Sequence, residues 1–145
     1  MPIRFFSEAI LFKIKNPRNV VRWINESANK EKKAISVINY IFCSDQYLLQ
    51  LNQDFLKHKS LTDIITFDDS VGPVLSGEIY ISIERVSENA SKYASDFDEE
   101  LRRVMIHGIL HLSGYRDKKV LEKAVMRKKE STYLSLWKRM FHVKR

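Results

Sequence analysis

The stretch from Val104 to Asp117 reads V-M-I-H-G-I-L-H-L-S-G-Y-R-D, and the rest of the chain can be understood around it. In a helix, His107 and His111 would lie on one face with Cβ atoms about 5–6 Å apart, so both imidazoles could reach one ion. Gly114 follows, and a glycine free to adopt φ > 0 lets the chain leave the helix and double back. Asp117 would then bring a carboxylate to the same point. Three ligands of this kind predict a metal site with one open position, which is typical of catalytic zinc.

The spacing of this motif resembles that of the metzincin zinc hydrolases, H-E-x-x-H-x-x-G-x-x-H, at both histidines and at the glycine. Asp117 stands at the third histidine, and zinc accepts an oxygen ligand there. Gly108 stands where a metalloprotease carries its general-base glutamate. An ordinary structural explanation remains open, because His107 and His111 lie in an apolar run that could bury them as hydrogen-bonded core histidines. The glycine and the carboxylate at matching offsets favour the metal site.

Length and composition indicate one domain spanning residues 1–145, since a chain of this size with 44% hydrophobic residues can bury a sizeable core. The 25 basic residues outnumber the 18 acidic ones, giving a formal charge of +7. This balance favours an anionic partner, most commonly nucleic acid, although a soluble protein with a basic surface would look the same. The single cysteine, Cys43, excludes an internal disulfide and indicates a buried thiol in a reducing compartment.

The N-terminal segment does not resemble a signal peptide, because Arg4, Glu8 and Lys13 interrupt its short apolar run. No apolar run approaches the roughly 18 residues of a membrane span. We therefore expect a cytoplasmic protein without a membrane partner.

The pattern of apolar residues predicts an α+β fold: a small mixed four-stranded sheet packed with about five or six helices, with the metal site on a central helix. That helix needs the sheet as cover for Ile106, Ile109, Leu110 and Leu112. Asn16 is expected to cap the first helix, with Pro17 at its first position. The predicted strands cover residues 3–14, 34–43, 62–68 and 77–83, and the helices begin near residues 17, 46, 83, 97 and 120.

Basic residues alternate with Trp137 and Phe141 in the C-terminal segment 137–145. Such a segment could contact RNA by charge and stacking. An amphipathic terminal helix with a solvated basic end explains the same pattern and is favoured here.

Three segments stand out together: T-D-I-I-T-F at 62–67, G-E-I at 77–79 and H-G-I-L-H-L-S-G-Y at 107–115. They resemble T-D-V-L-S-F, G-D-I and H-G-x-L-H-L-x-G-Y-D-H, which are typical of the YbeY endoribonucleases, the bacterial rRNA maturation factors. The resemblance implies a cytoplasmic, zinc-dependent endoribonuclease selective for single strands, acting in 16S rRNA 3′-end maturation and ribosome quality control. Its partners would be rRNA and the 30S subunit or 70S ribosome, with no DNA. The family's metal positions fall on His107, His111 and Asp117, holding one zinc ion, although other divalent metals suit these ligands too.

Two departures from the family pattern stand out. Asp117 replaces the family's third histidine, with Arg116 at the aspartate before it, and Leu56 stands where the family's Y-R-G-K-D loop has an arginine implied in catalysis. Lys57, Lys59 and Arg116 are the candidate catalytic cations that could replace that arginine, with His58 as a further source of charge. A lysine, however, lacks the bidentate fork that arginine offers to a phosphate.

The expected chemistry is metal-assisted hydrolysis of RNA, in which the ion activates water or polarises a phosphate oxygen. A phosphodiester is already anionic, so cations matter more than the carboxylate base absent at Gly108. Glu78 and Asp68 are candidates to orient a histidine Nδ1–H, and ordinary surface carboxylates are the alternative. Two other functions stay open: a zinc peptidase, and a non-catalytic ribosome-binding protein stabilised by metal, which Leu56 would favour.

Overall fold

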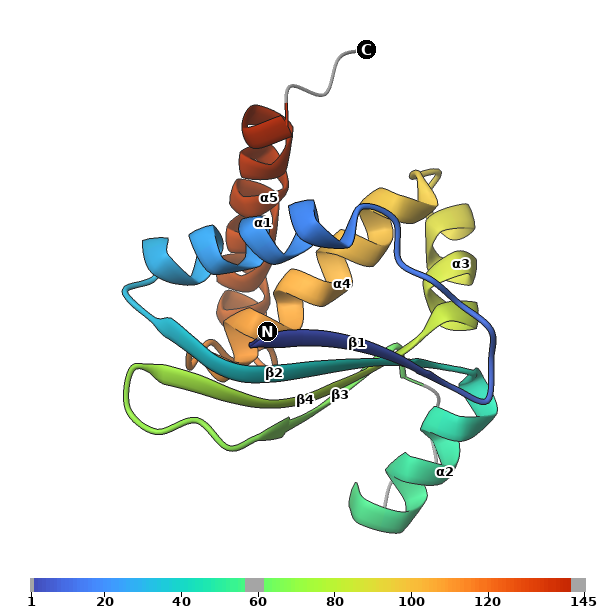
Figure 1. The fold of residues 1–145 in the computed structure, drawn as a ribbon. Coiled ribbons are helices and arrows are strands. Elements are labelled where there is room, and N and C mark those ends of the chain that lie inside the picture. The colour runs from blue at the N-terminus through green and yellow to red at the C-terminus, as the bar shows by residue number, and fades with distance from the viewer. Residues whose placement is uncertain (1, 57–61, 142–145) are drawn as a thin grey trace.

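The computed structural model describes residues 2–56 and 62–141, and in them one mixed sheet lies between helices on its two faces (Figure 1). The predicted α+β class with four strands is confirmed, and the described residues form five helices. The strands are β1 (Ile3–Glu8), β2 (Ala34–Cys43), β3 (Ile64–Asp68) and β4 (Val74–Ser82). The helices are α1 (Pro17–Lys30), α2 (Asp45–Leu56), α3 (Ile83–Lys92), α4 (Phe97–Leu112) and α5 (Val120–Phe141).

The sheet has the order β1-β2-β4-β3. β1 and β4 both pair with β2 in parallel, whereas β3 runs antiparallel to β4 and forms one edge. Side chains alternate between the two faces. On one face Tyr40 is paired with Phe5 and Ile79, and these residues belong to the main core under α1, α4 and α5.

Helix α4 packs against this face of the sheet, as its apolar residues predict (Figure 1). A glycine allows the close approach: a Cβ on Gly108 would lie 3.0 Å from Cδ1 of Ile79 and 3.2 Å from Cδ1 of Ile64. The buried hydroxyl of Tyr40 also donates a hydrogen bond to the Met105 carbonyl, at 3.0 Å. These contacts fix the height and rotation of the helix that carries both histidines.

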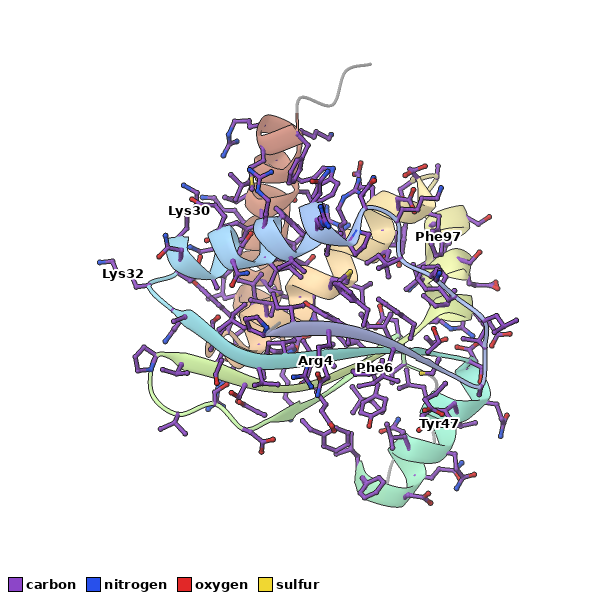
Figure 2. The ribbon with its side chains drawn as sticks, in the orientation of Figure 1. Arg4, Phe6, Lys30, Lys32, Tyr47 and Phe97 are labelled. Carbon is purple, nitrogen blue, oxygen red and sulfur yellow. The ribbon has the colours of Figure 1, made fainter. Side chains whose placement is uncertain are left out.

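Helix α2 covers part of the opposite face, where Figure 2 shows Tyr47 below the sheet. A small second core forms there from Cys43, Leu48 and Ile65. Burial, together with the nearby carboxylates, raises the pKa of the Cys43 thiol to about 12. The prediction of a buried cysteine is confirmed.

Two predictions about the N-terminal region are wrong. The first strand was expected over residues 3–14 but ends at Glu8, because Ala9 adopts a left-handed conformation with φ of 61° that an extended strand cannot continue through. Asn16 was expected to cap α1 with its side chain. It also adopts a left-handed conformation, whereas side-chain capping needs an extended one, and it makes no such bond. Pro17 does open the helix as predicted.

The C-terminal segment is helical up to Phe141, and its tryptophan is part of the core. Trp137 is buried against Trp23, with ring centroids 5.7 Å apart, and the Arg102 guanidinium lies 4.4 Å from the Trp137 ring centroid. The amphipathic-helix explanation therefore holds for Trp137, which is not free to stack on RNA. Residues 142–145 lie outside the described part of the chain. None of the helices described combines the length and the apolar character needed to cross a membrane.

Candidate metal centre

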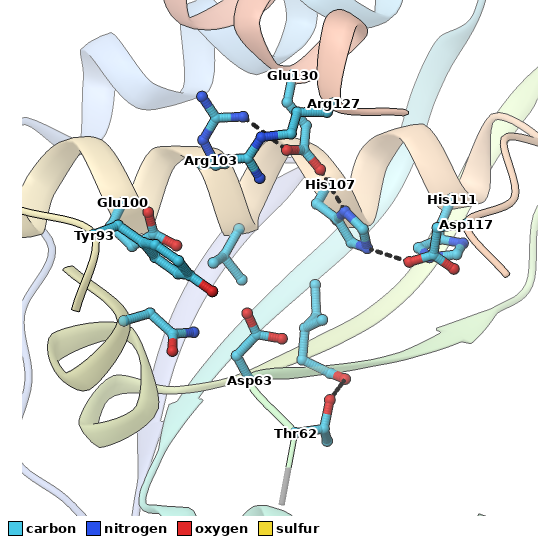
Figure 3. A pocket seen from close by; sticks show the side chains of 13 residues that line it. Thr62, Asp63, Tyr93, Glu100, Arg103, His107, His111, Asp117, Arg127 and Glu130 are labelled. Atoms are coloured by element: carbon cyan, nitrogen blue, oxygen red, sulfur yellow. Dashed lines mark hydrogen bonds and ion pairs between the residues drawn. The ribbon is translucent and has the colours of Figure 1, made fainter. Parts of the chain in front are cut away.

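The three predicted ligands converge at the C-terminal end of α4 (Figure 3). Oδ2 of Asp117 lies 3.2 Å from Nε2 of His107 and 3.4 Å from Nε2 of His111. One potential ligand atom from each residue lies within 4.8 Å of the others. The donor set of two imidazole nitrogens and one carboxylate oxygen fits a divalent ion such as zinc.

A helix-ending turn brings the carboxylate back to the histidines. Gly114 adopts φ of 109°, and the Tyr115 N–H bonds the Leu110 carbonyl while the Gly114 N–H bonds that of His111, both at 3.0 Å. This is the hydrogen-bond pattern of a Schellman motif. The predicted role of Gly114, to let the chain double back toward Asp117, is confirmed.

A buried glutamate from α5 orients the first histidine. Oε2 of Glu130 lies 2.6 Å from Nδ1 of His107, and the glutamate is only 5% exposed. Burial by itself would lower the pKa of His107, but the hydrogen bond and charge of Glu130, with the charges of Asp117 and Asp63, raise it overall. With Nδ1 bonded to Glu130, Nε2 is the nitrogen that faces the other two ligands.

The two carboxylates that the sequence suggested for this role do not perform it. Glu78 is exposed on the opposite face of the sheet, since its neighbour Ile79 is the residue that packs against α4. Asp68 instead accepts a hydrogen bond from the Ser70 N–H, at 2.8 Å, in the turn after β3. A sequence signal for Glu130 did exist, because a glutamate there interrupts the inward-facing stripe of α5.

A cavity of about 390 Å³ opens beside the ligands, and we call it the metal hollow. Arg103 and Arg127 line it, and Arg103 is held by Glu130, whose Oε1 lies 2.9 Å from Nη1 of the arginine. The sequence did not single out these two arginines, although Arg103 stands four residues before His107, on the same helical face. The other charged and aromatic residues of the metal hollow are Asp63, Tyr93 and Glu100 (Figure 3).

Of the predicted catalytic cations, only Arg116 belongs to the described residues, and it does not line the metal hollow. Arg116 is exposed and lines a separate depression with Leu121 and Val125. Lys57 and Lys59, with His58 between them, lie outside the described residues. Leu56 is the last residue of α2 and lines a second depression, to which Asp117 also contributes.

Two acidic side chains on the wall of the metal hollow are partly removed from water. Burial raises the pKa of Asp63, against an opposing effect of the His107 charge, and burial likewise raises the pKa of Glu100. Both carboxyl groups therefore bind a proton more readily than an exposed carboxyl does. A low-dielectric wall of this kind also strengthens any charge interaction inside the hollow.

The loop that carries Asp117 is fastened from outside the metal hollow. Glu31, just after α1, accepts hydrogen bonds from the hydroxyls of Tyr115, at 2.7 Å, and of Tyr133, and it forms an ion pair with Lys129 at 3.0 Å. Helix α1, helix α5 and the ligand-bearing loop are thereby joined at one buried carboxylate.

These features define a class of protein: an α+β domain whose central helix and the turn after it bring together three side chains that could hold a metal ion, beside two arginines. The family described as Endoribonuclease YbeY matches residues 6–138. The chain belongs to this family, which confirms the resemblance found in its motifs.

Individual relatives agree over nearly the whole chain. An Endoribonuclease YbeY of Flavobacterium psychrophilum is 48% identical over 139 residues, covering 96% of both chains. One of Cytophaga hutchinsonii is 50% identical over 137 residues, covering 94% of this chain and 96% of its own. The solution structure of TM1509 from Thermotoga maritima is 30% identical and superposes with a TM-score of 0.67, covering 97% of this chain and 91% of that one.

Proposed function

We propose that this protein is a zinc-dependent endoribonuclease, selective for single strands, that acts in the cytoplasm on 16S rRNA 3′-end maturation and in ribosome quality control. Family membership supports RNA cleavage. The observation that carries the proposal is the convergence of His107, His111 and Asp117 within 4.8 Å. The formal charge of +7 agrees with rRNA, in the 30S subunit or the 70S ribosome, as the partner.

The three ligands would hold one ion through Nε2 of each histidine and a carboxylate oxygen of Asp117. Zinc suits this set best, and nickel or another divalent ion would also be accepted. When bound, the ion supplies Lewis acidity toward a phosphate oxygen or water.

The surrounding side chains have separate tasks in this proposal. Glu130 accepts a hydrogen bond from Nδ1–H of His107 and so orients Nε2 of that ring toward the position where the metal would bind. Arg127 is exposed at the metal hollow and can offer its planar fork to a phosphate, while Arg103 adds positive charge from a position fixed by Glu130. Asp63, with its raised pKa, is suited to exchange a proton with the substrate through its carboxyl oxygens. Catalytic roles for Lys57, Lys59 and Arg116 stay predictions.

A peptidase function is less well supported. The position that carries the general base in metalloproteases is Gly108, which faces Ile79 and Ile64 of the sheet and not the metal hollow. A glutamate at that position would be buried among isoleucines, so it could not reach a substrate.

The direct test is cleavage of a single-stranded RNA by wild type and by His111→Ala, each stripped of metal and then assayed with and without zinc. We expect cleavage only by the zinc-loaded wild type. The loss in His111→Ala should exceed the roughly 10–100-fold effect of outer-shell changes, since a ligand is removed. Glu88→Gln, at an exposed position of α3, serves as the control. Equal rates in all four conditions would refute the proposal, and casein digestion would favour the peptidase.

The biological role needs a second experiment. In a deletion strain, 16S rRNA should accumulate with unprocessed 3′ ends, and wild type but not His111→Ala should restore them. Elemental analysis of the purified protein identifies the metal. Rescue by His111→Ala, together with retained ribosome binding, would favour the non-catalytic alternative that Leu56 suggests.

A further inference from the structure

An exposed aromatic ring stands on the wall of the metal hollow. Tyr93 is 59% exposed, and in Figure 3 it lies at the far side of the metal hollow from His111 and Asp117. No other tyrosine, phenylalanine or tryptophan of the described residues lines this cavity. An uncovered ring beside a site for phosphate chemistry is unusual for a packing residue and suits stacking on a planar ligand.

The backbone at Tyr93 is held rigidly although its side chain is exposed. Tyr93 is the C-cap residue directly after α3, and Ala94 after it adopts φ of 53°. The Ser95 N–H bonds the Ala90 carbonyl at 2.9 Å and the Ala94 N–H bonds that of Ser91 at 3.2 Å, which is again the Schellman pattern. A ring on a fixed helix end loses little freedom on binding, so it is pre-organised as a platform.

The ring keeps a free surface toward the metal hollow. Nζ of Lys92 lies 5.5 Å from the Tyr93 ring centroid, and Lys92 is not among the residues that line the cavity. The lysine therefore adds positive charge next to the ring from outside. A stacked base whose sugar-phosphate passes nearby would benefit from both the ring and the charge.

A hydrogen-bonding group stands one helical turn before the ring. Asn89 also lines the metal hollow, and within the described residues its side-chain amide has no hydrogen-bond partner. An amide offers two donors and one acceptor in a plane, which matches the edge of a nucleobase.

We propose that Tyr93 and Asn89 form a nucleobase subsite, in which the ring stacks on the base adjoining the phosphate at the metal ligands and the amide contacts the edge of that base. This inference rests on the proposed function. It explains why a single strand would be selected, because a base in a duplex must first unpair and unstack before it can stack on Tyr93. The subsite makes the cavity wall opposite the metal ligands a determinant of specificity.

The test combines a protein change with an RNA change. Single-stranded oligoribonucleotides, each lacking the base at one position around the cleavage point, are given to wild type, Tyr93→Ala and Tyr93→Phe. Cleavage is measured as kcat/KM in zinc, and equilibrium binding is measured in parallel after zinc is chelated. Phe6→Ala is the matched control, since Phe6 is 46% exposed on the opposite face of the sheet (Figure 2).

At one position, base removal should lower wild-type kcat/KM and affinity by about 5- to 150-fold, the range of one base–aromatic stack. Tyr93→Ala should show the same loss on intact RNA and no further loss at that position, while Tyr93→Phe and Phe6→Ala behave as wild type. Asn89→Ala should alter the preference among bases at that position only.

Each result decides between the two proposals. If wild type cleaves RNA but Tyr93→Ala and base removal act independently at every position, the subsite is refuted and the nuclease stands. If nothing is cleaved but the coupling between Tyr93 and one base persists in binding, the subsite stands and the nuclease fails. Loss of both signals in wild type refutes both.

Discussion

The Glu130 carboxylate contacts two functional side chains at once, His107 through Oε2 and Arg103 through Oε1. It is almost fully buried, so these two contacts replace the water that an exposed carboxylate would bind. Because it fixes the His107 ring, its removal should affect metal affinity even though Glu130 is not itself a ligand.

We expect Glu130→Gln to weaken zinc binding by about 10–100-fold, since an amide cannot supply the charge that raises the basicity of His107. Competition with a zinc-sensitive chelating dye measures the affinity directly. Glu88→Gln, a change of the same kind on the exposed surface of α3, should bind zinc as wild type does. Unchanged affinity in Glu130→Gln would show that the negative charge of this side chain is not needed to hold the ion.

Residue spacing explains why the three candidate ligands could be predicted from the sequence, whereas the neighbouring side chains of α5 could not. The candidate ligands all belong to the end of α4 and the turn after it: His107, His111 and Asp117. Helical periodicity and the conformation of one glycine are therefore enough to bring their side chains together. Glu130 and Arg127 come from α5, and their distance from His107 depends on how α5 crosses α4. Local patterns do not determine that crossing.

At the scale of elements, the pairing of β3 with β4 depends on a glycine that sequence analysis noted only as part of a motif. A Cβ on Gly77 would lie 2.2 Å from the backbone oxygen of Phe67. This oxygen belongs to the paired strand, so it cannot move aside as the end of a flexible side chain could. β3 leads back to Asp63 and β4 leads into α3, so this pairing also positions the wall of the metal hollow.

Gly77→Ala should therefore destabilise the protein by about 1–3 kcal/mol or more, because strands must separate to admit the methyl group. Gly72→Ala is the matched control. A Cβ there meets nothing within 4 Å, and its left-handed φ of 57° limits the expected cost to about 1–2 kcal/mol. Urea unfolding of both variants gives the comparison, and a smaller loss for Gly77→Ala than for Gly72→Ala would contradict this account.

Glu31 connects the end of α1 with α5 and with the loop that carries Asp117. We therefore expect the free energy of unfolding to depend on whether Glu31 is ionised. Burial raises its pKa, but hydrogen bonds from two tyrosines and the bond and charge of Lys129 outweigh burial and lower the pKa below the ordinary 4.5. An acid whose pKa is lower in the folded state stabilises the fold above its unfolded pKa, and that stabilisation is lost as pH falls through the folded value.

The free energy of unfolding of Glu31→Gln should thus lie about 1–3 kcal/mol below that of wild type at pH 7. The difference in free energy of unfolding between wild type and Glu31→Gln should become smaller as pH falls below about 4.5. Unfolding by urea at a series of pH values from 7 to 3 measures it. Glu26→Gln, in the last two turns of α1, should show no such convergence. A difference that stays constant with pH for Glu31→Gln would mean that the charge of Glu31 has no role.

For the whole molecule, the overall α+β class could be predicted from alternating strand and helix patterns, because each element has its own periodicity. The end of β1 could not, since Ala9 carries no sequence signal for the left-handed conformation that stops it. The same holds for the buried position of Trp137, which depends on the distant Trp23 on α1.

Zinc should stabilise the whole fold, because the ligand geometry exists only when α4 and its turn are formed. At a zinc concentration of 100 times the dissociation constant the gain is about 2.7 kcal/mol. For a chain of this length that corresponds to an increase in Tm of roughly 5–10 °C. Calorimetry with and without a chelator measures it. The Tm of His111→Ala should be the same with and without zinc. A wild-type Tm that also does not change with zinc would argue against a metal site.

The charge of the whole molecule predicts how RNA binding responds to salt. If binding neutralises about five phosphates, affinity for single-stranded RNA should fall roughly 100-fold between 50 and 200 mM salt, because counterions are released from the strand. Arg127→Ala should reduce the slope of log affinity against log salt by about 0.7, the value of one phosphate contact on a single strand. Lys30→Ala removes the same charge at the exposed end of α1 (Figure 2). Lys30 does not line the metal hollow, so this variant should leave the slope unchanged. Equal slopes for wild type and Arg127→Ala would show that Arg127 does not contact a phosphate of the bound RNA.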